Sequence, residues 1–329
     1  MKRIAVLDDY QGAVLSLPYW TRLAGRATVE VYRDTVPDEE ALVRRLQQYD
    51  IVVPIRERTR FPASVLQRLP ALELLALTGR NSGHVDVDAA SARGILVTET
   101  EGSGASAVEH TIALLLALVR RIPQEDRAMR AGGWQTGLAV DLVGKTIGIV
   151  GLGRIGRRVA AFAKLLEMRV LAWGPTLDDE RAAAAGARRV GLDELLRESD
   201  VVTLHLRLSE RTRGIIGAAQ FSLMKPTAFF VNTARGALVD EQALLGALEA
   251  NRIAGAALDV YQTEPLPAEH PLRSCENAVL SPHMGFVTWE AYHLFFGQAV
   301  EAIETYLQGK VPARALNPQA MAQRGRAAR

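Results

Sequence analysis

The sequence predicts an α/β protein with two domains, each built around a doubly wound parallel β-sheet. Short apolar runs alternate along the chain with segments of helical period, which is typical of parallel strands joined by helices. This alternation stops and then starts again after Gly144 and Lys145. A chain of 329 residues, 48% of them hydrophobic, is also long enough to form two separate cores.

In the N-terminal part, we expect buried strands at the apolar runs 3–7, 51–55 and 72–77. Residues 39–47 have helical period and lie between the first two of these runs. Residues 106–121 predict a long helix with apolar side chains around much of its surface. A helix of this kind is expected to be buried between the two domains or between subunits.

In the C-terminal part, the apolar runs are clearer and predict a series of strands. A helix is expected from Asp240, an acceptable N-cap, to about Asn251, and a last helix over 295–307 is expected to return to the first domain. Residues from Gln319 onward are expected to form a disordered tail. The six predicted strands are 146–150, 169–173, 201–206, 228–232, 256–260 and 278–280.

Composition argues against several classes of partner. The 39 basic and 37 acidic side chains are scattered, which indicates neither nucleic acid nor an anionic membrane. The longest apolar run, 112–119, is far shorter than the roughly 20 residues of a bilayer span. Asp8 and Asp9 cut the first apolar run too short for a secretory signal, and Cys275 is the only cysteine. We therefore expect a cytoplasmic protein whose partners are small molecules.

A GxGxxG motif at residues 151–156 follows a predicted strand and opens an amphipathic helix. Gly151 would make the tight turn, Gly153 would let the backbone approach a pyrophosphate, and Gly156 would let helix and strand pack closely. The free N–H groups of the helix N-terminus favour phosphate binding. The motif thus predicts a dinucleotide site on a Rossmann-type sheet, the alternative being a simple strand-to-helix turn.

The residue that would bind the ribose departs from this fingerprint. An Asp or Glu is expected at the end of the second strand, about 20 residues after the glycines. Gly174 stands there, and Asp178 and Asp179 follow a little later. Since no Arg or Lys adjoins Gly174 to bind a 2′-phosphate, the motif leaves the choice between NAD and NADP open.

Three charged side chains follow the last three predicted strands: Arg235, Glu264 and His283. Because ligands of such sheets bind at the carboxyl ends of the strands, we expect the three to meet in one crevice. An imidazole transfers protons near neutral pH, a carboxylate orients it, and a guanidinium binds a substrate carboxylate. Taken singly, each has an ordinary structural role as a cap, turn or loop residue; together they predict hydride transfer to or from a small 2-oxo or 2-hydroxy acid.

The chain resembles the D-isomer-specific 2-hydroxyacid dehydrogenase family, which includes phosphoglycerate, glycerate, D-lactate and formate dehydrogenases. The resemblance runs from about Lys2 to Leu316. The motifs that carry it are residues 144–156, 224–226, 231–236, 257–260, 264–266 and 282–283.

The resemblance implies that Glu264 holds His283 in the right tautomer while His283 exchanges a proton with the substrate oxygen. It implies that Arg235 binds the substrate carboxylate, and that Asp259 faces the nicotinamide carboxamide. NAD is the expected cofactor, with NADP not excluded, and no metal is required because Arg235 supplies positive charge. Besides the three glycines of the motif, the expected cofactor contacts are Arg154, Ile155, Gly174, Leu206, Arg207, Thr233, Ala234, Asp259 and Gly285.

The family layout implies a cofactor domain, residues 103–286, inserted into a flavodoxin-like substrate domain formed by 1–102 and 287–318, with 319–329 as the tail. Family members are usually homodimers joined through their cofactor domains. Such a dimer would account for the apolar helix near Leu114. A nicotinamide-sensing, corepressor-like regulatory protein on the same fold is the alternative function.

Departures from the family pattern leave the substrate open, between a phosphoglycerate dehydrogenase-like and a hydroxypyruvate or glyoxylate reductase-like acid. Arg207 stands where the family usually has proline, and the substrate-facing loop that begins at Asn81, after Arg80, is unusual. Arg56 and Arg58 match a basic loop that lies near the substrate in phosphoglycerate dehydrogenases. We expect Arg56, Arg80 and Asn81 to contact substrate. The alternative for Arg56 is that it belongs to a solvated charged loop.

Overall fold

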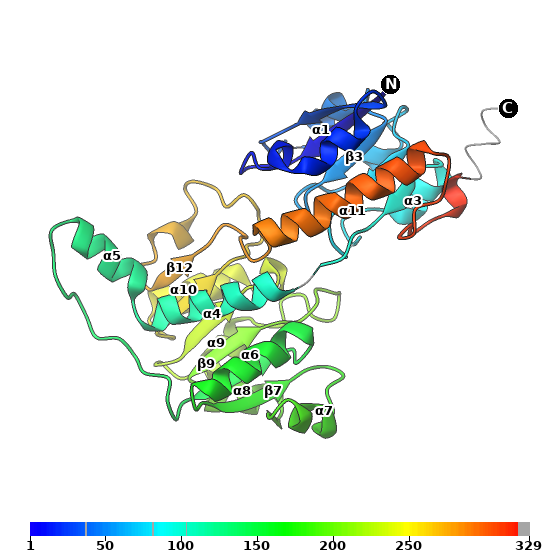
Figure 1. The fold of residues 1–329 in the computed structure, drawn as a ribbon. Helices are drawn as coiled ribbons and strands as arrows, with labels where there is room; N and C mark the ends of the chain where they lie inside the picture. The colour runs from blue at the N-terminus through cyan, green and yellow to red at the C-terminus, as the bar shows by residue number, and fades with distance from the viewer. Residues whose placement is uncertain (37, 81, 103, 322–329) are drawn as a thin grey trace. The chain divides into compact units, whose positions relative to one another are not determined.

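A computed structural model describes residues 1–36, 38–80, 82–102 and 104–321, and it divides the chain into two compact units (Figure 1). Unit 1 comprises Met1–Ser103 and Thr288–Arg329, and unit 2 comprises Gly104–Val287. Unit 2 is therefore inserted into the sequence of unit 1. Each unit has its own parallel sheet, as the β/α alternation predicts.

Unit 1 contains a five-stranded parallel sheet in the order β2-β1-β3-β4-β5, the flavodoxin order. Three strands were predicted and two were not: β2, which alternates between partly buried and exposed residues, and β5, a buried strand of three residues. The strands are β1 Lys2–Leu7, β2 Ala27–Val31, β3 Ile51–Pro54, β4 Leu74–Ala76 and β5 Leu96–Thr98. The helices are η1 Val14–Ser16, η2 Pro18–Leu23, α1 Glu39–Leu46, α2 Ala63–Leu66, α3 Val87–Ala92 and α11 Trp289–Leu307.

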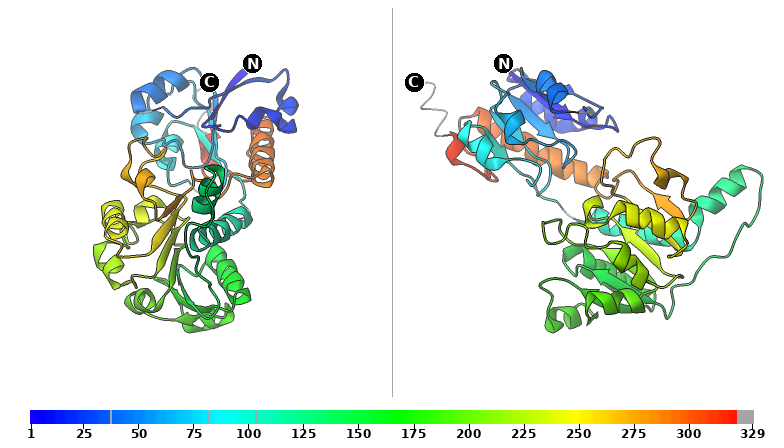
Figure 2. Two further views of the ribbon diagram at one scale, coloured as in Figure 1. Left: turned by 90° about the vertical axis from the view of Figure 1, so that its left-hand side faces the viewer. Right: turned by 180° about the vertical axis from the view of Figure 1, so that it is seen from behind.

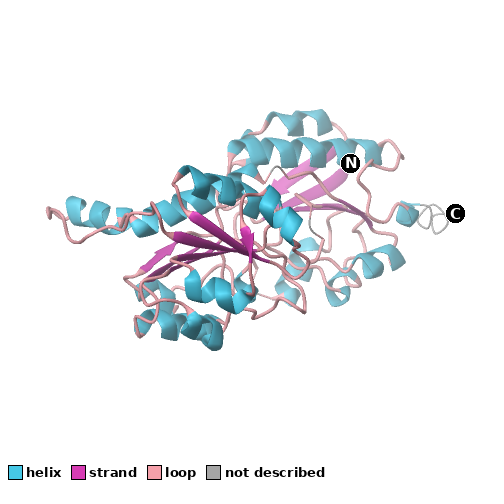
Figure 3. Ribbon diagram, turned by 90° about the horizontal axis from the view of Figure 1, so that it is seen from below, coloured by secondary structure: helices cyan, strands magenta, loops and turns pink. Residues whose placement is uncertain are grey.

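Unit 2 contains a seven-stranded parallel sheet in the order β12-β11-β10-β9-β6-β7-β8 (Figure 3). The six predicted strands are confirmed; the seventh, β8, was missed because it is only two exposed arginines long. The strands are β6 Thr146–Val150, β7 Arg169–Trp173, β8 Arg188–Arg189, β9 Val201–Leu204, β10 Phe229–Asn232, β11 Gly255–Leu258 and β12 Ala278–Leu280. The helices are α4 Ala105–Val119, α5 Ile122–Arg130, α6 Arg154–Leu165, α7 Asp179–Ala184, α8 Leu192–Glu198, α9 Ala218–Leu223, η3 Gly236–Leu238, α10 Glu241–Glu249 and η4 Pro271–Ser274.

Both faces of the sheet in unit 2 are buried, which explains why its strands are continuous apolar runs. Neighbouring residues of one strand belong to different cores: Val150 packs with α8, α9 and α10, whereas Ile149 packs with α4 and α6. Phe230 and Val231 divide in the same way. Helices therefore cover the sheet on both sides, and only the ends of its strands are open to a ligand.

Most of the large apolar side chains of α4 are covered by unit 2 itself, whereas Ile112 and Leu116 are only partly buried, so a contact of this helix with a second subunit stays a prediction. The side chains of α4 pack against α6 and strands β10, β11 and β12, and Leu114 is only 7% exposed. The exposed apolar residues come later, on α5 and the segment after it, which extend away from the rest of unit 2 (Figure 2). We name α5 and residues 131–143 the arm.

Two expectations about the chain as a whole can be compared with the structure. Ala320 is fully buried, so packed structure continues past the predicted start of the tail at Gln319; residues 322–329 lie outside the described residues. Across the residues that are described, every helix is too short or too polar to cross a membrane.

Candidate active site

The candidate site lies at the carboxyl edge of the sheet in unit 2, where the strand order reverses beside β6. Strand β6 pairs with β9 on one side and with β7 on the other, and Val150 is level with both Leu204 and Trp173. Ligands of doubly wound sheets bind in the crevice outside such a switch point. The loops that follow β6, β7 and β9 therefore form one part of the crevice, and those after β10, β11 and β12 form the other.

The three glycines of the turn after β6 differ in the space around them: Gly151 and Gly156 are closely packed, and Gly153 is open. Gly151 has φ 107°, and a Cβ there would lie 2.7 Å from the carbonyl carbon of His205. A Cβ on Gly156 would lie 2.3 Å from the carbonyl oxygen of Gly151, whereas one on Gly153 would meet no atom within 4 Å. Helix α6 starts at Arg154 without a side-chain cap. Open space in front of free helix N–H groups fits a pyrophosphate.

The imidazole of His283 and the carboxylate of Glu264 form a direct pair. Nδ1 of His283 lies 2.5 Å from Oε2 of Glu264, and the other carboxylate oxygen accepts the N–H of Tyr261 at 2.9 Å. The two side chains are 21% and 29% exposed. Because Nδ1 faces the carboxylate, Nε2 is the nitrogen left to exchange a proton with a ligand. His283 also has φ 53°, a conformation that non-glycine residues rarely adopt outside strongly constrained sites.

A buried carboxylate holds the loop that carries His283. Asp259, 1% exposed, accepts the N–H groups of Met284 at 2.7 Å and Gly285 at 2.9 Å. Nε2 of His110 lies 3.0 Å from this carboxylate and 2.9 Å from the hydroxyl of Ser281. Burial acts to raise the pKa of Asp259, but the hydrogen bonds from His110, Ser281 and Met284 outweigh it and lower the pKa.

His110, to which the sequence patterns assign no chemistry, lies on α4 and reaches Asp259 across 149 positions of sequence. No local pattern marks such a residue, since its contact depends on where α4 crosses the sheet. Asp259 was expected to face the nicotinamide carboxamide. Its contacts in the structure are with the His283 loop and α4, so a contact with cofactor stays a prediction.

The loop that carries Arg235 is tied to its neighbours. The side chain of Asn232 accepts the N–H of Ala234 and donates to the carbonyl of Arg235, both at 3.0 Å. A Cβ on Gly236 would lie 2.0 Å from the carbonyl carbon of Tyr261, so only glycine allows these two loops to touch. The structure thus brings the loops of Arg235, Glu264 and His283 to one edge of the sheet.

The other expected cofactor residues also lie at this edge. Gly174 follows β7, Leu206 and Arg207 follow β9, and the hydroxyl of Thr233 lies 2.7 Å from that of Thr111. The two acids considered as substitutes for the ribose-binding carboxylate have other partners. Asp178 caps α7 by accepting the N–H of Arg181 at 2.8 Å, and Asp179 forms an ion pair with Arg189 at 3.3 Å.

Besides Arg235, the residues expected to contact substrate belong to unit 1. Arg56 has φ 58°, its N–H donates to the hydroxyl of Thr78 at 2.8 Å, and its guanidinium lies 5.6 Å from the ring centre of Phe295. Arg80 forms an ion pair with Glu101 at 3.6 Å. Asn81 lies outside the described residues. Within the described residues, no three His, Cys, Asp or Glu side chains gather as metal ligands would.

Comparison with known proteins identifies relatives across both units. The family model described as "D-isomer specific 2-hydroxyacid dehydrogenase, NAD binding domain" matches residues 112–285. A glyoxylate reductase of Aeropyrum pernix is 39% identical over 291 residues, which cover 85% of this chain and 87% of that protein. A D-3-phosphoglycerate dehydrogenase of Archaeoglobus fulgidus is 41% identical over 266 residues, 80% of this chain but only 50% of that protein.

A solved structure of a phosphoglycerate oxidoreductase from Vibrio cholerae O395 has the same fold. It superposes with a TM-score of 0.89 at 38% identity, covering 94% of this chain and 99% of that one. This chain spans about half the length of some curated relatives that it matches, so they contain sequence with no counterpart here.

Proposed function

We propose, because the chain belongs to the D-isomer specific 2-hydroxyacid dehydrogenase family, that it interconverts a small 2-oxo acid and a D-2-hydroxy acid by hydride transfer with NAD(P). One observation carries the proposal. The 2.5 Å pair of His283 and Glu264 lies at the same sheet edge as a glycine turn with open space for a pyrophosphate.

The residues of this chain transfer the proton in the proposed reaction. In the reducing direction, Nε2 of His283 gives a proton to the carbonyl oxygen of the 2-oxo acid, and Glu264 stabilises the orientation of the ring. In the oxidising direction, the same nitrogen takes the hydroxyl proton. When bound, the nicotinamide supplies or accepts the hydride.

Arg235 binds the carboxylate that all 2-oxo and 2-hydroxy acids share, and two parallel hydrogen bonds from a guanidinium fix its orientation. In unit 1, Arg56, Arg80 and Asn81 are proposed to contact the remainder of the acid. A phosphate or second carboxylate is the group that suits the basic loop of Arg56 and Arg58. The relatives are named for an acid without a phosphate and for one with a phosphate: glyoxylate reductase and D-3-phosphoglycerate dehydrogenase.

The test is absorbance at 340 nm while the purified protein is mixed with NADH or NADPH and a panel of 2-oxo acids, including glyoxylate, pyruvate, hydroxypyruvate and a phosphorylated 3-carbon acid. We expect oxidation of the reduced cofactor with at least one acid of the panel. Binding of the dinucleotide without turnover of any acid would contradict the proposal and favour a nicotinamide-sensing regulatory protein.

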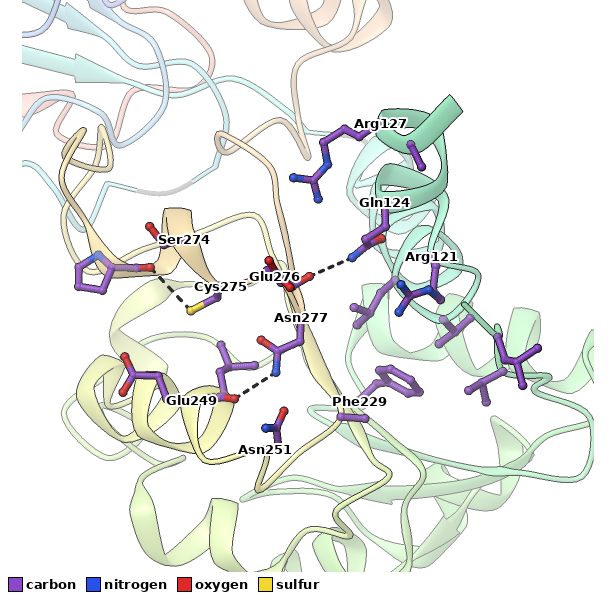
Figure 4. A pocket seen from close by; sticks show the side chains of 18 residues that line it. Arg121, Gln124, Arg127, Phe229, Glu249, Asn251, Ser274, Cys275, Glu276 and Asn277 are labelled. Atoms are coloured by element: carbon purple, nitrogen blue, oxygen red, sulfur yellow. Dashed lines mark hydrogen bonds between the residues drawn. The ribbon is translucent and has the colours of Figure 1, made fainter. Parts of the chain in front are cut away.

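We further infer that the protein is a homodimer and that the arm takes part in the interface. Helix α5 has no buried residue, and Trp134 and Leu138 are 70% and 94% exposed. The arm borders a hollow of about 1100 Å³ that is lined on the other side by residues 274–277 (Figure 4). The catalytic three do not line this hollow, so its apolar and polar surface is available to a second copy.

Light scattering of the purified protein tests the dimer, with twice the mass of one chain expected. Replacing Trp134 and Leu138 together by Asp is expected to give monomers, because charged groups would enter an apolar contact. Leu165→Asp is the matched control, since Leu165 is 81% exposed on α6. A monomeric wild type, or a dimer unaffected by the double change, would remove the arm from the interface.

We also infer a cytoplasmic location. The support is the single cysteine, Cys275, which is a free thiol and suits a reducing compartment. Fractionation of cells that express the full chain tests this, and recovery outside the cytoplasmic fraction would contradict it.

A further inference from the structure

The structure leaves the ribose position after β7 without the carboxylate that usually accepts ribose hydroxyls. A Cβ on Gly174 would meet only Leu177, at 3.5 Å. A larger residue would therefore fit here, and lack of space does not explain the glycine. Asp178 and Asp179, the next acids along the chain, are used by the α7 cap and by Arg189. A carboxylate at this position repels a 2′-phosphate, and its absence removes that repulsion.

A cation stands on the opposite side of the glycine turn. Arg207 is exposed and follows β9. Its carbonyl accepts the hydroxyl of Thr212 at 2.7 Å, and that same hydroxyl accepts the N–H of Ser209 at 2.8 Å. The backbone of Arg207 is therefore held in place. Its guanidinium forms no ion pair with any carboxylate of the described chain.

The sheet places the backbone of Arg207 close to the ribose position. Strands β9 and β7 flank β6, and their last residues, Leu204 and Trp173, are level with Val150. Neighbouring strands lie about 4.8 Å apart, so the ends of β9 and β7 are about 10 Å apart. The backbone of the loop after β9 also touches the turn directly, since a Cβ on Gly151 would lie 2.8 Å from the N of Leu206. Arg207 follows immediately.

We propose that Arg207 binds the 2′-phosphate of NADP(H), and that the chain prefers NADP(H) over NAD(H). A 2′-phosphate carries close to two negative charges, and a guanidinium binds it through two parallel hydrogen bonds. A cation for the 2′-phosphate would be expected beside Gly174, at the end of β7. In this chain it follows β9, on the other side of β6. This inference rests on the proposed dinucleotide site but does not depend on the identity of the acid.

The test measures binding without substrate, by calorimetric titration of the full chain with NADPH and NADH. Adenosine 2′,5′-bisphosphate and adenosine 5′-monophosphate are the matched probes that lack nicotinamide. We expect the 2′-phosphorylated member of each pair to bind more tightly by roughly 10- to 100-fold, the range for hydrogen bonds to a charged group. The difference should shrink at high salt.

Three variants assign the effect to a residue. Arg207→Ala should remove most of the preference for the 2′-phosphate and leave NADH affinity within about 2-fold, a difference below 0.5 kcal/mol. Arg207→Lys should keep part of it, because the charge stays while the paired geometry is lost. Arg211→Ala, an exposed arginine of the same loop, is the control and should change neither affinity.

Two results would overturn the proposal. One is equal or tighter binding of NADH by the wild type. The other is equal loss of NADH and NADPH affinity in Arg207→Ala, which would mean that the side chain contacts adenine or pyrophosphate instead. Failure to bind any dinucleotide or adenosine probe would contradict the proposed function itself, so the two failures are distinguishable. Thermal unfolding of each variant checks that the fold is retained.

Discussion

The two halves of the crevice in unit 2 differ in how firmly their residues are held. At the ends of β10, β11 and β12, the loops are joined by buried hydrogen bonds, among them the hydroxyl of Tyr261 to the carbonyl of Ser281 at 3.0 Å. At the ends of β7 and β9, the corresponding residues are a glycine, Gly174, and an exposed arginine, Arg207.

Under the proposed function, the two halves have different tasks. Proton and hydride transfer depend on atoms held within a fraction of an ångström, so the reacting half needs a network that fixes His283, Glu264 and Arg235. The adenosine half only binds, and binding tolerates exchange of residue types as long as charge and space match the ligand. We expect substitutions in the first half to change turnover and those in the second to change cofactor affinity.

The largest effect is expected for His283→Ala. Loss of the proton-transferring group should lower kcat by roughly 10²- to 10⁴-fold and leave dinucleotide affinity unchanged. Steady-state kinetics and cofactor titration check the two parts. His293→Ala, in unit 1, is a control that should retain normal turnover, because His293 is exposed and bonds Tyr19. Turnover near the wild-type value in His283→Ala would remove this residue from the mechanism.

A smaller effect is expected for Arg235→Ala, which removes the clamp on the substrate carboxylate. We expect kcat/KM to fall by roughly 10²-fold, with KM raised and kcat lowered, since the lost hydrogen bonds were to a charged group and also oriented the acid. Arg252→Ala changes an exposed arginine after α10 and serves as control. An unchanged KM would contradict substrate binding by Arg235.

Two glycine variants test the turn after β6, which is proposed to bind the pyrophosphate. Gly153→Ala adds a Cβ with no atom within 4 Å, so thermal unfolding should stay normal while dinucleotide affinity falls by roughly 10-fold through the blocked approach of the pyrophosphate. Gly156→Ala places a Cβ 2.3 Å from a backbone oxygen and should destabilise the fold by roughly 1–3 kcal/mol. Unchanged cofactor affinity in Gly153→Ala would contradict the placement of the phosphates.

The smallest effect is a pH dependence of stability from Asp259. Its pKa is lowered in the folded protein, so its contribution to the free energy of unfolding is complete above its unfolded-state pKa of about 4 and is lost as pH falls through the folded-state pKa. Urea denaturation at several pH values should show that Asp259→Asn is less stable at pH 7 and that its deficit shrinks in acid. A deficit that is constant with pH would contradict this ionisation.

Much of unit 2 could be predicted from sequence because its strands are buried on both faces and are therefore unbroken apolar runs. Strands β6, β7 and β12 begin and end where they were predicted. The half-exposed or exposed strands β2 and β8 could not be predicted, since they lack such runs. Strand β5 was missed although its three residues are buried, like those of the predicted β4. The period of α4 did not say which neighbours bury it, and the structure shows that α6 and strands β10, β11 and β12 cover much of its apolar side.

By itself, the sequence determined the α/β class, the glycine turn and the three charged residues that follow successive strands, because these depend on local order along the chain. Only the tertiary structure decided that His110 supports Asp259 and that Arg207 lies across β6 from Gly174. In both cases the residues are far apart in sequence. They become neighbours only when parallel pairing brings the strand ends to one edge of the sheet.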